Sequence, residues 1–174
     1  MNSKKYLLLL FTIIGLQYVV NAQENKELFT IYLVRHSEKD VSPANRKNPP
    51  LTKCGEQRAK NLNKFLEKVN LNVIYSTNYI RTKNTAKPTA DGKNMPIKIY
   101  NPRELTQFSK TLIDKKQDAL VVGHSNTTGV LAGLLVGEKI KPFDESIYNR
   151  IYQVVIHKKT GRLHILNTSF SCDN

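Results

Sequence analysis

The chain has 174 residues and a formal net charge of +13 at pH 7, with 27 lysines and arginines against 14 aspartates and glutamates. This length fits one domain with a sizeable core. The positive charge favours anionic partners. The lysines are dispersed and aromatic residues do not alternate with them, so the pattern argues against nucleic-acid recognition. The two cysteines lack metal-ligand spacing.

The first 22 residues have the pattern of a secretory signal peptide. Lys4 and Lys5 precede a largely apolar run, and a cleavage point follows at Ala22. The run is shorter than the roughly 20 apolar residues of a membrane span. We therefore expect an exported protein, periplasmic or secreted, with residues 23–174 as one domain and no stable membrane span after cleavage. An uncleaved membrane anchor is the alternative.

The cysteines of the chain are Cys54 and Cys172. An exported protein could join them in a disulfide. The sequence does not show whether their Cα atoms come within bridging distance, so their pairing stays open.

The first predicted elements are a strand, a loop and a helix. An apolar, β-like run covers residues 28–34, and the polar, proline-containing segment 40–50 reads as a loop over a site. Thr52 is the expected N-cap of a helix with an apolar face at helical spacing, which ends near Asn70.

The remaining elements alternate before a final hairpin. We expect strands at 73–77, 97–100 and 119–123, helices at 78–91, after 101–102 and at 130–136, and hairpin strands at 151–156 and 163–166 around a glycine turn at 159–162. This order predicts a three-layer α/β/α sandwich with a mostly parallel sheet and an antiparallel edge hairpin.

Basic residues follow three of the parallel strands. Arg35 and His36 follow the first strand, Arg81 lies just after the second, and His124 follows the strand at 119–123. The carboxyl ends of parallel strands meet at one edge of a sheet. Two arginines can bind phosphate oxygens in bidentate fashion, so the sequence predicts a phosphate site there.

Four segments resemble motifs of the histidine phosphatase (phosphoglycerate mutase-like) superfamily. They are Leu33-Val34-Arg35-His36-Ser37-Glu38, like R-H-G-E with serine for glycine, then residues 50–59, like L-T-x-x-G-x-x-Q-A, residues 75–86, like S-S-x-x-x-R-A-x-Q-T-A, and residues 121–127, like the second-histidine motif. Their order and spacing fit from residue 30 to about residue 135. The resemblance implies the phosphoglycerate mutase-like fold and a small phosphatase.

This resemblance also implies roles for individual residues. His36 would be the nucleophile and become phosphorylated, while Arg35, Arg81 and His124 would hold the phosphoryl oxygens. Either Glu38 or a backbone carbonyl would orient the His36 imidazole. No metal or cofactor is expected, and the substrate is a small anionic phosphorylated compound.

The proton donor is the open question of this site. In one branch of the superfamily an acid directly follows the second histidine, and here that residue is Ser125. In the mutase-like branch a glutamate follows the third strand, which makes Glu104 the candidate; the alternative is that Glu104 only favours its helix N-terminus. Without an acid, acyl phosphates or phosphohistidine would be preferred. Ser125 and Asn126 are candidate phosphate donors or helix caps.

Two other functions remain as alternatives. The same fold could serve as a non-catalytic phosphate- or glycan-binding module. A serine hydrolase could use Ser125, since residues 123–127 half-match a nucleophile elbow and Asp144 and His157 follow in triad order. Tyr148 could line the pocket or pack at its rim. The individual substrate and the oligomeric state stay open.

Overall fold

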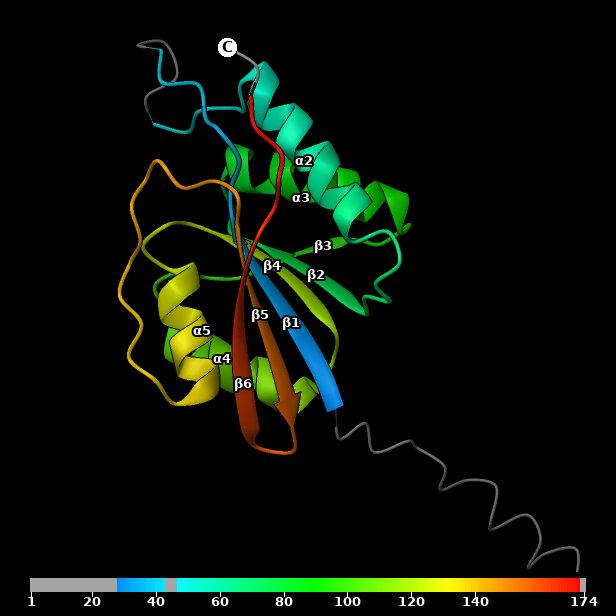
Figure 1. Ribbon diagram of the computed structural model, residues 1–174, viewed down its shortest axis with the longest axis vertical. Helices are drawn as coiled ribbons and strands as arrows, with labels where there is room; N and C mark the ends of the chain where they lie inside the picture. Colours follow the sequence, from blue (N-terminus) through cyan, green and yellow to red (C-terminus); the bar gives the residue numbers. More distant parts are fainter. Residues whose placement is uncertain (1–27, 43–46, 173–174) are drawn as a thin grey trace, which may run out of the picture.

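The computed structural model describes residues 28–42 and 47–172, and the predicted signal segment lies outside them. Strands and helices alternate before two consecutive strands end the chain (Figure 1). None of these helices has the length and apolarity needed to cross a bilayer. In chain order the elements are β1 (Leu28–Arg35), α2 (Lys53–Phe65), β2 (Val73–Ser76), α3 (Ile80–Gly92), β3 (Ile97–Ile99), α4 (Leu105–Lys115), β4 (Ala119–Gly123), α5 (Thr128–Val136), β5 (Arg150–His157) and β6 (Thr160–Asn167).

The six strands form one sheet in the order β3-β2-β4-β1-β5-β6. The first four of these run parallel to one another. β5 pairs with β1 in the antiparallel sense and β6 pairs with β5. The predicted α/β/α sandwich with an antiparallel edge hairpin is therefore confirmed.

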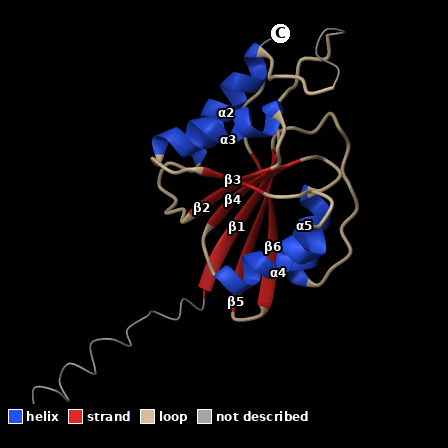
Figure 2. Cartoon of the chain, turned by 180° about the vertical axis from the view of Figure 1, so that it is seen from behind, coloured by secondary structure: helices blue, strands red, loops and turns tan. Residues whose placement is uncertain are grey.

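Helices cover both faces of the sheet, α2 and α3 on one side and α4 and α5 on the other (Figure 2). Successive side chains of a strand point to opposite faces, so β1 contributes to two core clusters. Phe29, Ile31 and Leu33 pack in the cluster that includes α4 and α5. Tyr32 and Val34 pack in the cluster that includes α2 and α3. Burial on both faces explains the continuous apolar run.

The start of α2 is fixed by its cap and by a close backbone contact. The Thr52 hydroxyl accepts a hydrogen bond from the Gly55 N–H at 3.0 Å, which confirms the predicted N-cap. A Cβ at Gly55 would collide with the backbone oxygen of Glu38, so glycine lets the helix lie against the loop after β1. The helix ends at Phe65, before the predicted end at Asn70; the next residue, Leu66, has the non-helical angles φ −91° and ψ 6°, and its side chain is buried in the core.

The predicted position of the hairpin turn is wrong. The turn lies at residues 158–159, where Lys158 has φ 56°. Gly161 instead pairs with Ile156 inside the ladder. A Cβ on Gly161 would lie 2.7 Å from the backbone oxygen of Leu135 at the end of α5. The glycine therefore permits close packing of helix and strand, and not the turn.

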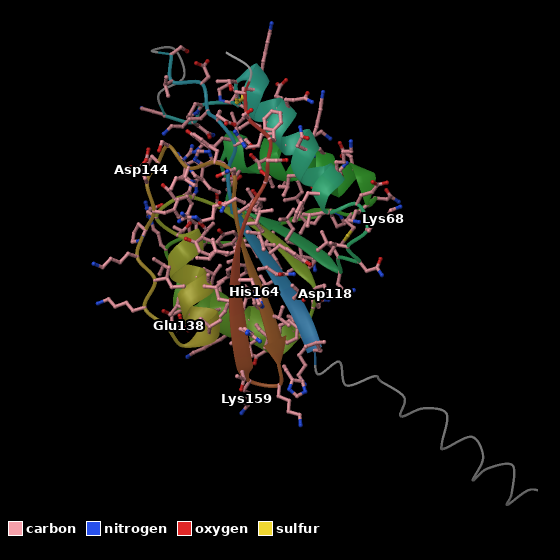
Figure 3. All side chains as sticks on the ribbon, viewed as in Figure 1. Lys68, Asp118, Glu138, Asp144, Lys159 and His164 are labelled. Carbon is pink, nitrogen blue, oxygen red and sulfur yellow. A yellow bond between two sulfur atoms is a disulfide. The ribbon has the colours of Figure 1, made fainter. Side chains whose placement is uncertain are left out.

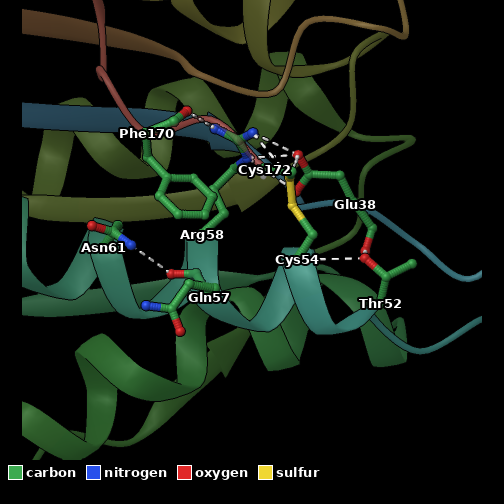
Figure 4. Close-up of a disulfide and its surroundings, with 9 residues drawn as sticks. Glu38, Thr52, Cys54, Gln57, Arg58, Asn61, Phe170 and Cys172 are labelled. Atoms are coloured by element: carbon green, nitrogen blue, oxygen red, sulfur yellow. Dashed lines mark hydrogen bonds and ion pairs between the residues drawn. A yellow bond between two sulfur atoms is a disulfide. The ribbon is translucent and has the colours of Figure 1, made fainter. Parts of the chain in front are cut away.

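The segment after β6, residues 168–172, runs back to α2, and we call it the C-terminal strap (Figure 1). It ends in a disulfide between Cys172 and Cys54 of α2, whose Cα atoms are 5.6 Å apart (Figure 4). The pairing that the sequence left open is thus made.

Arg58 of α2 connects the strap to the loop after β1. Its Nη1 donates to the backbone oxygen of Phe170 at 3.0 Å, and its guanidinium lies 4.9 Å from the Phe170 ring centroid. Its Nε and Nη2 donate to Oε1 of Glu38 at 2.8 and 2.6 Å (Figure 4). One guanidinium therefore ties together α2, the strap and the loop that follows β1.

Candidate active site

The site lies where the carboxyl ends of β1, β2 and β4 meet. The parallel register places Arg35 opposite Gly123, and the His36 N–H donates to the Gly123 carbonyl at 2.9 Å. His36 and His124, the residues that follow these two strands, therefore lie side by side, with ring centroids 5.5 Å apart. The convergence predicted from the strand ends is present.

A pocket of about 410 Å³ opens at this end of the sheet. Six of the candidate site residues line it: Arg35, His36, Arg81, His124, Ser125 and Asn126. The N-cap of α5 is Thr127, so the alternative that Ser125 or Asn126 caps this helix is wrong. Both remain candidate donors to a bound phosphoryl group.

The His36 imidazole is buried and held in one orientation. Its Nδ1 lies 2.8 Å from the Ser37 carbonyl oxygen. A carbonyl only accepts hydrogen bonds, so we assign the proton to Nδ1 and the lone pair to Nε2. Burial lowers the pKa of His36 to about 3, with the charges of Arg35 and Arg81 adding to this effect and the Ser37 bond opposing it. His36 is therefore a neutral imidazole whose Nε2 can act as a nucleophile.

His124 is also neutral and is held by a chain of hydroxyl groups. Its Nδ1 lies 3.5 Å from Nη2 of Arg81, which only donates. Its Nε2–H can therefore donate to the Thr77 hydroxyl at 3.0 Å, which donates in turn to the Thr82 hydroxyl at 2.9 Å. Burial and then the charges of Arg81 and Arg35 lower the pKa of His124 to about 4.

We expect both imidazoles to remain neutral in the free protein until the pH falls below about 5. Their folded pKa values lie below the unfolded value of about 6.5, so the unfolded chain binds these protons first. The free energy of unfolding should therefore fall as the pH drops from about 6.5 toward 3. NMR titration of the imidazole resonances, assigned with His36→Ala and His124→Ala, measures the pKa values of the two rings directly. Midpoints near 6.5 for both rings would contradict the assignment.

The two arginines are positioned by aromatic rings. The Arg35 guanidinium lies 4.1 Å from the Tyr148 ring centroid and donates to the Tyr148 hydroxyl and to the Glu145 carbonyl. Tyr148 thus packs against Arg35 and does not line the pocket. The Arg81 guanidinium lies 4.5 Å from the ring centroid of Tyr79. Within the described residues, the buried Nε of each arginine has no hydrogen-bond partner. An anion that accepts from these N–H groups would satisfy donors that are costly to leave unpaired.

Glu38 does not orient the imidazole, because the Ser37 carbonyl does so. The Glu38 carboxylate is instead bound by Arg58. The Ser37 N–H donates to the Thr85 hydroxyl of α3 at 2.9 Å. Helices α2 and α3 therefore both hold the loop that carries His36, and of the two predicted alternatives the backbone carbonyl is correct.

Glu104 lies outside the pocket, contrary to its predicted role as proton donor. It is exposed at the N-cap position of α4, whereas the preceding Arg103 does line the pocket. The carboxylate in the lining belongs to Glu145, whose side chain is 74% exposed and whose Oε2 lies 4.0 Å from Nη2 of Arg35.

Six further lining residues were not predicted as site residues from the sequence: Lys39, Tyr79, Pro102, Arg103, Thr127 and Glu145. Lys39 directly follows the first motif and Tyr79 lies inside the third, so position relative to the motifs could have indicated them. Arg103 and Glu145 come from loops without a local signal, and only the tertiary structure brings them to the pocket.

The triad proposed for a serine hydrolase does not form. His157 pairs with Leu28 at the start of β1, whereas Ser125 follows β4 at the opposite end of the sheet. Figure 3 shows the hairpin, marked by Lys159 and His164, far from the loop that carries Asp144. The serine hydrolase alternative is therefore wrong.

Comparisons with known proteins agree with this description. Residues 31–102 match the family model of the histidine phosphatase superfamily (branch 1), and this range contains the first three of the four motifs that resemble that superfamily. No curated protein sequence matches the chain significantly. Among solved structures, the chain is similar to the protein histidine phosphatase SixA complexed with tungstate (TM-score 0.67, 17% identity, 80% of this chain and 97% of that chain). It is also similar to the alpha-ribazole phosphatase from Shigella flexneri (0.64, 18%, 84% and 100%) and to YhfR from Bacillus stearothermophilus (0.65, 18%, 79% and 96%). The structural likenesses show a shared fold.

Proposed function

We propose that the protein is a phosphatase that hydrolyses phosphomonoesters, or related phosphoanhydrides and phosphoramidates, through a phosphohistidine at His36. The observation that carries this proposal is a buried, neutral imidazole with an available Nε2 in a pocket that Arg35 and Arg81 also line. The match to the histidine phosphatase family model and the two structural neighbours named as phosphatases support it.

The chemistry takes two steps. Nε2 of His36 attacks the phosphorus atom while the bond from phosphorus to the leaving oxygen breaks, and that oxygen takes a proton. Water then attacks the phosphorus atom and gives a proton back to the group that protonated the leaving oxygen, the N–P bond breaks with its electron pair returning to Nε2, and inorganic phosphate leaves. Arg35 and Arg81 stabilise the negative charge on the phosphoryl oxygens, and Nδ1 of His124 faces Nη2 of Arg81 and helps to orient it. The Ser37 carbonyl accepts from Nδ1–H and stabilises the positive charge that the ring gains on phosphorylation.

Glu145 is the candidate proton donor, because it is the carboxyl group in the pocket lining. We expect Glu145→Gln to lower kcat/KM for an alkyl phosphate by roughly 10²-fold, and much less for p-nitrophenyl phosphate, whose leaving group needs no acid. Glu104→Gln is the matched control and should change neither value. Loss of alkyl phosphate hydrolysis in Glu104→Gln alone would mean that Glu104 is the proton donor, as predicted from the sequence. No effect in either variant would mean that neither carboxyl group is the proton donor.

The test of the function is hydrolysis of p-nitrophenyl phosphate by the purified protein. We expect turnover that orthovanadate inhibits and that fluorophosphonates leave unchanged. The alternative, a non-catalytic phosphate- or glycan-binding module, predicts that the protein binds phosphate and gives no turnover.

We also propose that the protein is exported, to the periplasm or outside the cell. The signal-like pattern of residues 1–22 supports this location. The Cys54–Cys172 disulfide supports it independently, because disulfides persist in oxidising compartments. N-terminal sequencing of the mature protein should then begin at Gln23, and recovery of the uncleaved chain in the cytoplasm would contradict export.

A further inference from the structure

We infer that the substrate carries a second negative charge on its leaving group and that Arg103 binds this charge. The inference rests on the proposed function, and it names the class of substrate: a phosphomonoester with an additional phosphate or carboxylate. It depends on one cation, Arg103, which lines both the pocket that contains His36 and a second, neighbouring cavity.

The phosphoryl group is already provided with donors. Arg35, at the end of β1, and Arg81, in the first turn of α3, each have a buried Nε without a partner among the described residues. Arg103 is additional, and it comes from a different part of the fold, the loop between β3 and α4.

The Arg103 guanidinium is available to a ligand. The residue is exposed, and the one hydrogen bond recorded for it in the described part of the chain runs from its backbone N–H to the side chain of Asn101. No described carboxylate forms an ion pair with it, although Glu104 is its direct neighbour in sequence. A cation that lines a pocket without an internal partner is suited to bind an anion brought by the substrate.

A second cavity, of about 390 Å³, lies next to the first. The two share Tyr79, Pro102 and Arg103 as lining residues. Ile99, which is 52% exposed, contributes an apolar surface beyond this shared rim. His36 lines only the first cavity, so Arg103 lies on the path from the phosphoryl site toward the second one. That path is where a leaving group would extend.

The geometry therefore divides the substrate into three parts. The transferred phosphoryl group lies against Arg35 and Arg81, the body of the leaving group lies against Tyr79 and Pro102, and its second anionic group reaches Arg103. The apolar surface can contact a carbon skeleton. Inorganic polyphosphate has no carbon skeleton, so it fits this surface less well.

The test compares two esters that differ in one charge, the phosphate monoesters of 4-hydroxybenzoate and 4-hydroxybenzamide. We expect kcat/KM of the wild-type protein to be roughly tenfold higher for the benzoate ester at low salt, and this advantage to shrink as salt screens it. Arg103→Ala should bring the ratio of the two esters close to one, and Arg103→Lys should restore part of it. Arg162→Ala removes one exposed cation near the hairpin, at the other end of the sheet, and should keep the wild-type ratio.

Failure of the inference and failure of the proposed function give different results. If the wild-type protein hydrolyses both esters equally well, or if Arg103→Ala keeps the wild-type ratio, Arg103 does not select the leaving group. If neither ester is hydrolysed, the phosphatase proposal fails, and calorimetric binding of the two esters to His36→Ala still tests the inference. Equal dissociation constants there would overturn it, and tighter binding of the benzoate ester would support it. The bisphosphate of hydroquinone shows whether a second phosphate is preferred to a carboxylate.

Discussion

Replacement of His36 by alanine should reduce the rate of p-nitrophenyl phosphate hydrolysis by roughly 10⁴-fold or more, to near the uncatalysed rate in buffer. The variant loses the nitrogen that attacks phosphorus, and neither Arg35 nor Arg81 can replace it because guanidinium groups are not nucleophiles at neutral pH. Initial rates at saturating and limiting substrate measure the loss in kcat and in kcat/KM.

A matched variant separates a loss of chemistry from a loss of structure. His164→Ala also removes an imidazole, but an exposed one on the edge strand β6 (Figure 3). It should retain wild-type kcat. Thermal unfolding followed by circular dichroism should show that His36→Ala remains folded. If folded His36→Ala kept more than about a tenth of the wild-type rate, far above the loss expected for a nucleophile, another residue would be the nucleophile.

Removal of the Cys54–Cys172 disulfide should give the largest loss of stability. The bond joins residues 118 positions apart, and a cross-link that closes a loop of this length is worth about 5 kcal/mol in the chain-entropy model. The double variant Cys54→Ser, Cys172→Ser should unfold at a correspondingly lower urea concentration. Reductant should lower the stability of the wild-type protein to a similar value and leave the double variant unchanged.

The same variant should also affect the site, because the strap contacts Arg58. Without the disulfide, the Phe170 carbonyl and ring are held to α2 less firmly, and Arg58 is then freer to leave Glu38. We expect kcat/KM to fall severalfold as the loop that carries His36 becomes less ordered. If the wild-type protein had the same urea midpoint with and without reductant, the bond would not stabilise the protein as described.

The elements of the fold were predictable because their sequence patterns are local. The continuous apolar run at 119–123 is typical of a strand covered on both faces, and Thr52 has the chemistry of a helix cap. The convergence of His36, Arg81 and His124 also followed from the sequence, because parallel strands present their carboxyl ends at one edge.

The parts that the sequence did not predict depend on contacts between distant residues. Glu145 reaches the pocket because Arg35, 110 positions away, binds its backbone carbonyl. Glu38 lies one residue after the carbonyl that orients His36, but Arg58 captures its carboxylate instead. The sequence around Gly161 is typical of a turn, but in the structure this glycine packs against the end of α5. Such contacts between distant residues cannot be predicted from a local sequence pattern.

Trapping of the phosphorylated protein tests the central proposal most directly. Protein mixed with a labelled phosphomonoester and quenched within its turnover time should carry phosphate that is stable in base and labile in acid. Peptide mass spectrometry should place this phosphate on His36, and His36→Ala should carry none. Turnover by a wild-type protein that never carries phosphate on His36, or that carries it on Ser125, would contradict the proposal.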